Sequence, residues 1–247
     1  MNAASSSAAA RSSGPARWEV AAFAIAFAVA GLVALAVSFA GTGVYHDIAI
    51  REDIAREAFR APGWPDPAWG GGVEVTRYPH GTLVELHRRT LAYVLGEMPD
   101  LPSSPTRGDF YSPAERSHLA DVRGVFLGSR LAALGALAAL AWLLARRGDR
   151  RAALRLARAG AVASAAAVLV LAGAAALAFD AMFLLFHQVF FPQGNFLFDA
   201  RSSNMLTLYP EAYFYGVTLR IGASFVALAG VLAALSHAAL RRRSAPA

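Results

Sequence analysis

The sequence contains no cysteine and no lysine, and charge of either sign is scarce. Without cysteine the chain has no disulfide, no thiol nucleophile, no thiolate metal ligand and no cysteine-linked lipid anchor of its own. Only 16% of its 247 residues are charged, against about 25% in a typical soluble domain. This low charge, with 56% hydrophobic residues and a mean hydropathy of +0.42, indicates a membrane protein.

Four segments are apolar enough to cross a bilayer as helices, which takes about 20 residues each. The runs 20–45 and 159–179 carry no charge, and the other two segments carry one arginine near an end. The predicted fold is therefore all-α, an integral membrane protein with four transmembrane helices and an extracellular cap of helices and loops. The predicted spans are residues 18–45, 124–145, 159–180 and 216–240.

The arginines predict how the helices are oriented. Eleven of the 23 lie before the first span, in the segment 146–158 between spans two and three, or after span four. With four spans these clusters share one side, which the positive-inside rule makes the cytoplasm, with both termini inside. The net charge of +6 is therefore a topology signal and indicates no nucleic-acid partner.

The ends of the chain are predicted to be cytoplasmic tails, a disordered one over residues 1–17 and a short one over 241–247. The first apolar run is much longer than the 7–15 residues of a signal-peptide core. An uncleaved membrane anchor is therefore the favoured interpretation.

Two segments are predicted to lie outside the cell, and the first, residues 46–123, forms the cap. Residues 48–59 and 82–96 have helical periodicity, and the Pro- and Gly-rich residues 61–72 indicate a turn. Ser112-Pro113-Ala114-Glu115 is typical of a helix start, and that helix is predicted to continue into the second span. Its residues Glu115, His118 and Asp121 share a face, for which a solvated face with incidental charges is the simpler interpretation.

The second outer segment, residues 181–215, is dominated by aromatic residues. An interfacial aromatic belt would explain some of them, but Phe prevails here in a segment interrupted by proline and glycine. Irregular backbone at this depth must be buried or line a cavity, so we predict a loop that walls an apolar, aromatic cavity. The predicted cavity residues are Phe186, Phe190, Phe191, Phe196, Phe198, Tyr209 and Tyr213.

Polar residues are predicted to converge on the same level of the membrane. Charged groups in hydrocarbon are costly and count as functional candidates, although arginine near a helix end can also reach the interface by snorkelling. Pairing of charges for structure alone also stays open. These candidates are Arg130, Asp180, His187, Glu211 and Arg220.

No familiar hydrolase, metalloprotease or phosphate-binding motif is present, and no spacing indicates a metal site. What remains is acid–base chemistry by His118 and His187, with no metal or cofactor. Asp121 would fix the tautomer of His118, and Arg130 or Arg220 would bind an oxyanion. No side chain is well placed as a nucleophile, so the substrate would supply its own.

Three other histidines, His46, His80 and His87, are interpreted as surface residues without a role.

Two strings of residues resemble the signatures of one bacterial family. They are Phe-His-Gln-Val-Phe-Phe-Pro-Gln-Gly-Asn-Phe at 186–196, followed by Phe198-Asp199 and Leu208-Tyr209-Pro210-Glu211, and Glu-x-x-His-x-x-Asp-Val at 115–122. They are similar to those of the lipoprotein intramolecular transacylases, over about residues 110–220.

The resemblance implies four transmembrane helices, an extracellular cap and a diacylglyceryl lipoprotein that enters from the membrane. It also implies that the sn-2 acyl chain moves to the α-amine of the lipoprotein's own N-terminal cysteine, which leaves a lyso-form lipoprotein. The two catalytic histidines of the family would correspond to His118 and His187.

Other functions stay open on the sequence. A non-enzymatic membrane protein that binds lipid or lipoprotein would use the same aromatic cavity but not the histidines. A metal-dependent membrane hydrolase would need bound zinc. A transporter is the least favoured, because no span is interrupted near its middle and no inverted repeat is visible.

Overall fold

The computed structural model describes residues 14–60, 75–105, 108–199 and 202–242. The predictions for the tail residues 1–13, the turn at 61–72 and the last residues 243–247 lie outside these ranges.

Helices make up most of the described chain, joined by one pair of two-residue strands. In chain order the elements are α1 (Arg17–Phe39), α2 (Thr42–Arg51), the 3-10 turn η1 (Ile54–Arg56), β1 (Phe59–Arg60), β2 (Val75–Thr76), α3 (His80–Val94), α4 (Pro113–Ala145), α5 (Arg150–Leu177), α6 (Phe179–Phe190), α7 (Asn204–Leu208) and α8 (Glu211–Arg242). The strands β1 and β2 pair antiparallel, with Phe59 opposite Thr76.

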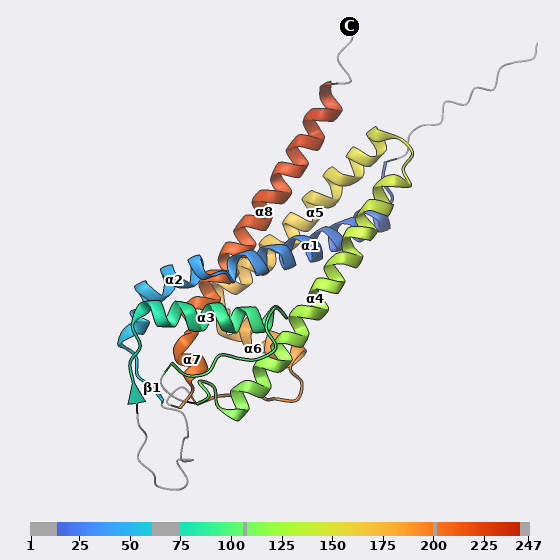
Figure 1. Ribbon diagram of the computed structural model, residues 1–247. Coiled ribbons are helices and arrows are strands. Elements are labelled where there is room, and N and C mark those ends of the chain that lie inside the picture. The colour runs from blue at the N-terminus through green and yellow to red at the C-terminus, as the bar shows by residue number, and fades with distance from the viewer. Residues whose placement is uncertain (1–13, 61–74, 106–107, 200–201, 243–247) are drawn as a thin grey trace, which may run out of the picture.

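Four helices, α1, α4, α5 and α8, are long and apolar enough to span a membrane, which confirms the four-helix membrane fold. The short elements gather at one end of this bundle (Figure 1). At the other end, Arg147 in the turn after α4 forms an ion pair with Glu19 of α1. There too, Arg158 of α5 donates to His237 of α8. The arginine clusters therefore share one end of the bundle, and the side of the membrane they occupy stays a prediction.

Small residues allow the spanning helices to approach closely. A methyl group at Gly160 of α5 would overlap the Phe23 ring of α1, and one at Gly222 of α8 would lie 2.8 Å from the Ala172 side chain of α5. Such contacts matter because lipid exerts no hydrophobic force that drives helices together.

The first two predicted helices end at other residues than predicted. The prediction of one span over 18–45 is wrong at its end, because α1 stops at Phe39 and α2 starts at Thr42 after the extended residue Gly41. The prediction of a helix over 48–59 is also wrong. The helix α2 ends at Arg51, and Asp53 has a left-handed φ of 50°, which a continuing helix cannot contain.

Two predicted loops contain helix. Within 146–158, only four residues form the turn, and α5 begins at Arg150 with the side chain of Asp149 accepting from the Ala152 N–H at 3.0 Å. The prediction that 181–215 is a loop is wrong for α6, for α7 and for the start of α8, which begins at Glu211. By contrast, the predicted start of α4 is confirmed, since Ser112 accepts from the Glu115 N–H at 3.3 Å and the helix runs unbroken to Ala145.

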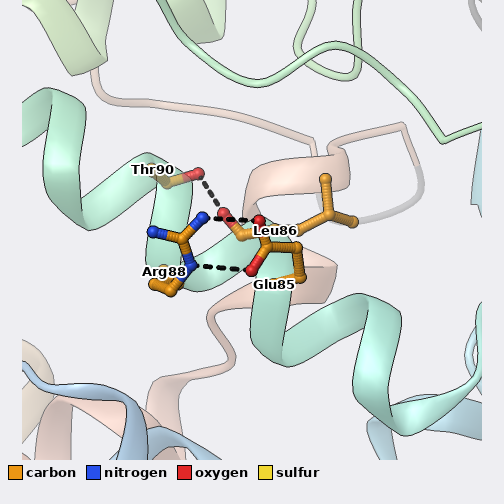
Figure 2. Close-up of polar contacts among 4 residues, drawn as sticks. All are labelled: Glu85, Leu86, Arg88 and Thr90. Carbon is orange, nitrogen blue, oxygen red and sulfur yellow. Dashed lines mark hydrogen bonds and ion pairs between the residues drawn. The ribbon is translucent and has the colours of Figure 1, made fainter. Parts of the chain in front are cut away.

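The helix α3 confirms the amphipathic pattern predicted for residues 82–96. On its exposed face Arg88 donates twice to Glu85, at 2.7 Å each (Figure 2). On its buried face Leu86 packs into the core of this end of the molecule, and the Thr90 hydroxyl donates to the Leu86 carbonyl at 2.8 Å. This buried face places a histidine, His87, in the interior.

The interpretation of His87 as a surface residue is wrong, because only 2% of it is exposed. Its Nε2–H donates at 2.9 Å to the Ala40 carbonyl, which the break after α1 leaves without a helical partner, and its Nδ1 accepts from the Tyr209 hydroxyl at 3.2 Å. Tyr45 stacks on the ring at 4.2 Å. The Tyr213 hydroxyl also donates to Ala40, at 3.4 Å. We call these five residues the His87 cluster; it joins the end of α1 to α2, α3 and the start of α8.

The His87 cluster predicts that the fold loses stability in mild acid. Burial lowers the pKa of His87 to about 4. Between about pH 6.5 and 4 the His87 ring therefore stays neutral in the folded protein, whereas in the unfolded chain it takes up a proton. Stability is therefore fully present above that pH and falls as the pH drops toward 4, by about 2 kcal/mol at pH 5.

Thermal unfolding in detergent at pH 7.5 and 5.0 measures this loss. The variant His87→Phe should have a lower Tm at pH 7.5, because it loses two hydrogen bonds, but a smaller drop between the two pH values than the wild type. An equal drop in both proteins would contradict the assignment.

Candidate functional site

The structure brings His118 and His187 together from two different helices. His118 lies one turn into α4 beyond Glu115, and His187 lies in the last turn of α6. Their ring centroids are 5.9 Å apart and their planes are inclined by 20°. Two imidazoles at this separation can both reach the atoms of one small reacting group between or beside them.

Phenylalanine rings enclose the histidine pair. Phe191 packs against both imidazoles, with its centroid 4.8 Å from His118 and 5.5 Å from His187. Phe198 lies at 5.6 Å from His118, and Phe196 at 5.1 Å from His187. The predicted aromatic cavity is largely filled around His118, because the rings pack against it and leave only 5% of His118 and 2% of Phe191 exposed.

One side of the enclosure remains accessible, along α6. Phe186 lies 5.5 Å from His187 and 4.7 Å from Phe190, and the exposed fractions of these two phenylalanines are 44% and 47%. Leu185 and Val189 of the same helix are also exposed. The pair is therefore approached over an apolar helix surface, which suits a lipid chain better than a polar solute.

The protonation of His187 follows from its backbone contact. Its Nδ1 lies 2.8 Å from the Phe183 carbonyl oxygen, one turn earlier in α6. Because a carbonyl only accepts, Nδ1 carries the hydrogen and Nε2 of the neutral ring keeps a free lone pair. His187 is thus oriented as a base through Nε2.

Glu115 fixes the start of α4 beneath the site. Its carboxylate accepts from the Ser112 N–H at 2.7 Å, from the Ser203 hydroxyl at 2.6 Å and from the Met205 N–H at 2.8 Å. Only 1% of Glu115 is exposed. The interpretation of this helix face as solvated is therefore wrong for Glu115 and for His118, and the carboxylate anchors the segment around α7 to α4.

Asp121 has contacts other than the predicted one with His118. Its Oδ2 accepts from the side-chain amides of Asn195, at 2.5 Å, and Gln193, at 2.8 Å. Asp121 therefore binds the loop that follows α6. The sequence has no periodic pattern in this loop that would predict the contacts of Gln193 and Asn195 with Asp121.

The two arginines expected at the site lie elsewhere. Arg130 is twelve residues beyond His118 along α4, about 18 Å by helix rise, and donates to the Leu95 carbonyl at 2.7 Å. Arg220 donates to the Gly216 carbonyl of its own helix at 3.0 Å and faces a surface depression of about 320 Å³ beside Asp47 and Arg51. The structure brings neither guanidinium to the imidazoles.

The remaining predicted residues divide between two places. Asp180 and Glu211 are exposed, and they lie close enough for their carboxyl groups to interact. Tyr209 and Tyr213 belong to the His87 cluster instead of the enclosure around the histidine pair. Phe183, whose ring lies 4.3 Å from His187, is part of the enclosure and was not among the predicted residues.

Within the described ranges, no three His, Asp or Glu side chains converge as ligands of one metal ion.

Comparisons with known proteins agree on one family and fold. The model of the lipoprotein intramolecular transacylase Lit family matches residues 73–214, which include both histidines. No curated protein sequence matches the chain.

Solved structures of the membrane integral lipoprotein intramolecular transacylase Lit from Bacillus cereus are similar to this one, with a TM-score of 0.67 at 15% identity. In one of them the match covers 92% of this chain and 96% of the other. Two further structures of the same protein carry a histidine replaced by arginine in one and by alanine in the other. The match covers 92% of this chain in both cases, and 92% and 94% of the other chains, respectively. At this identity the likeness establishes the shared fold.

The buried carboxylate of Glu115 is predicted to be a major source of stability at this end of the molecule. In Glu115→Ala the donors of Ser112, Ser203 and Met205 lose their acceptor, which should cost about 3 kcal/mol in the free energy of unfolding. The matched control is Asp109→Ala, which breaks a 2.8 Å ion pair between Arg116 and a 65% exposed aspartate and should cost less than about 0.5 kcal/mol. Denaturation of both variants measures the difference, and equal losses would contradict the anchoring role.

Proposed function

Because the chain belongs to the lipoprotein intramolecular transacylase family, we propose that it acts on diacylglyceryl lipoproteins in the bacterial membrane. It transfers the sn-2 acyl chain to the α-amine of the lipoprotein's own N-terminal cysteine and releases a lyso-form lipoprotein. The observation that carries the proposal is the pairing of His118 with His187 inside a phenylalanine enclosure, within the residues that match the family.

The reaction needs proton transfer and proximity, and the site offers both. The free amine attacks the ester carbonyl, a C–N bond forms, and the C–O bond to the sn-2 oxygen breaks. One histidine accepts the proton that leaves the nitrogen, and the other, as imidazolium, donates a proton to the departing glycerol oxygen. No water and no external acyl donor enters the balance, and the nucleophile belongs to the substrate, so the chain needs none.

Substrate approach is assigned to the apolar surface of α6. The exposed Phe186 and Phe190 contact the acyl chains, while the buried ring of Phe191 and the half-buried rings of Phe196 and Phe198 exclude water from the ester. Exclusion of water favours attack of the amine on the ester over hydrolysis of the ester. Asp180, about two turns before His187 on α6, and its neighbour Glu211 add negative charge that favours the approach of the substrate's N-terminal ammonium.

The membrane orientation belongs to the same proposal. The end with the arginine clusters and both termini faces the cytoplasm, and the end with α2, α3, α6 and α7 is an extracellular cap over the outer leaflet. The histidine pair then acts at the outer face of the membrane.

Single cysteines introduced into this cysteine-free chain test the orientation. In intact cells a membrane-impermeant maleimide should label Glu97→Cys, an exposed position at the capped end, and should not label Arg150→Cys, an exposed position at the start of α5. Both should react after the membrane is opened. The opposite labelling pattern would reverse the proposed topology.

Mass spectrometry of a reporter lipoprotein tests the reaction. The chain is expressed in a bacterium that makes only diacylated lipoproteins, and the N-terminal lipopeptide is fragmented. Because the transfer is an isomerisation, the intact mass stays the same. The fragments should show one acyl chain on the cysteine nitrogen and a glycerol with one ester.

Matched histidine variants assign the chemistry. His118→Ala and His187→Ala should each lower the rate about 100-fold or more, as loss of general acid–base catalysis does, while still inserting into the membrane. The control His46→Ala, at a half-exposed histidine of α2, should act as the wild type does. An unchanged lipopeptide despite good expression would exclude the transacylase activity and favour a protein that only binds lipoprotein.

A further inference from the structure

The loop that follows α6 brings Phe191 and Phe198 against the His118 ring, and it brings the polar side chain of Asn195 to α4. Its amide Nδ2 donates to Asp121 Oδ2 at 2.5 Å and lies 3.4 Å from the Ser117 hydroxyl. Asp121 and Ser117 are both on α4, at positions that flank His118 along the helix. The carboxamide is therefore held on α4 by one residue before His118 and one residue after it.

The orientation of this carboxamide is fixed by chemistry. A carboxylate has no hydrogen to donate, so the atom of Asn195 that faces Asp121 must be the NH2 group and not the oxygen. Gln193 also donates to Asp121, at 2.8 Å, which holds the carboxylate in place from a second side. The Oδ1 atom of Asn195 consequently points away from Asp121.

One buried atom on each of these two side chains lacks a hydrogen-bond partner. Among the polar side-chain atoms that the structure describes, both His118 Nδ1 and Asn195 Oδ1 are buried without a hydrogen bond. The Asn195 side chain nevertheless lies close enough to His118 to interact with its ring. Two lone pairs facing each other in a buried site would repel, whereas a hydrogen on Nδ1 turns the same approach into an attraction.

We propose that Asn195, held by Asp121, is a positioning residue that keeps the His118 ring in the Nδ1–H tautomer, with Nε2 free for proton transfer. The tautomer itself is a property of the protein without substrate. Its consequence for catalysis rests on the function proposed above.

The arrangement gives both histidines the same polarity. His187 donates from Nδ1 to the Phe183 carbonyl. With the proposed hydrogen of His118 on Nδ1, directed at Asn195, both rings present Nε2. One ring can then accept a proton through Nε2 while the other, already protonated, donates from the same position. An amide suits position 195 because it links Asp121 to the ring without placing a second carboxylate next to the first.

Nitrogen-15 NMR of histidine-labelled protein in nanodiscs tests the tautomer directly. At about pH 8, where an ordinary histidine is neutral, His118 should show a protonated Nδ1 and an unprotonated Nε2. Its signals are assigned by their loss in His118→Gln. Asn195→Ala should show a mixture of tautomers at His118 and leave His187 unchanged, and kcat should fall about 10-fold or more with little change in KM.

Two further variants separate positioning from folding. Asn195→Asp alone places two carboxylates together and should no longer hold His118 in the Nδ1–H tautomer. The exchange Asp121→Asn with Asn195→Asp restores an amide that donates to a carboxylate, and it should recover the Nδ1–H tautomer. Gln193→Ala, which leaves Asn195 on Asp121, should keep the wild-type tautomer.

An Nε2–H tautomer in the wild type, an unchanged Nδ1–H tautomer in Asn195→Ala, or a failure of the exchange to restore it would each overturn the proposal. These spectra need no substrate. A chain with the expected tautomer but no acyl transfer would overturn the proposed function and leave the positioning role standing.

Discussion

The carboxylate of Glu115 is the contact on which the arrangement around the site depends. It closes the first turn of α4 through Ser112, and it accepts from Ser203 and Met205, which begin the segment that leads into α8. The loop between α6 and that segment is thereby held against α4 at its far end, while Asp121 holds its near end through Asn195 and Gln193. Three donors compensate for the cost of burying the charge. With both ends of the loop fixed, Phe196 and Phe198 lie against the two imidazoles.

The four spanning helices are held together by other contacts than the end of the molecule that carries α2, α3, α6 and α7. Between the spans, association relies on close contact of small residues, as at Gly160 and Gly222. At the end that carries the short elements, aromatic rings and hydrogen bonds make most of the contacts. The largest cluster of buried residues in the described ranges lies there. The His87 cluster connects the two parts, because it satisfies the Ala40 carbonyl that the break after α1 exposes. The interruption between α1 and α2 is stabilised in this way.

Much of the fold could be predicted because membrane helices leave strong one-dimensional signals. Long apolar runs gave the four spans, and the capping residues Ser112 and Glu115 gave the start of α4 within a residue. Helix ends inside apolar sequence were missed, since the run through Gly41 and the Phe-rich start of α6 look alike whether or not the helix continues. His87 was misassigned because its burial depends on Tyr45, Tyr209 and Tyr213, which are distant in sequence.

Inspection of the amino-acid sequence is enough to identify the membrane fold, the grouping of arginines at one end and the two strings that contain His118 and His187. These are properties of local composition and spacing, which the chain carries before it folds. Which polar groups meet depends on the packing of helices and loops. Asp121 binds Asn195 and not the imidazole, Arg130 binds the Leu95 carbonyl, and Tyr209 joins His87. A buried polar group must find its partner in three dimensions, and the spacing of residues along the chain does not record which partner will lie nearest.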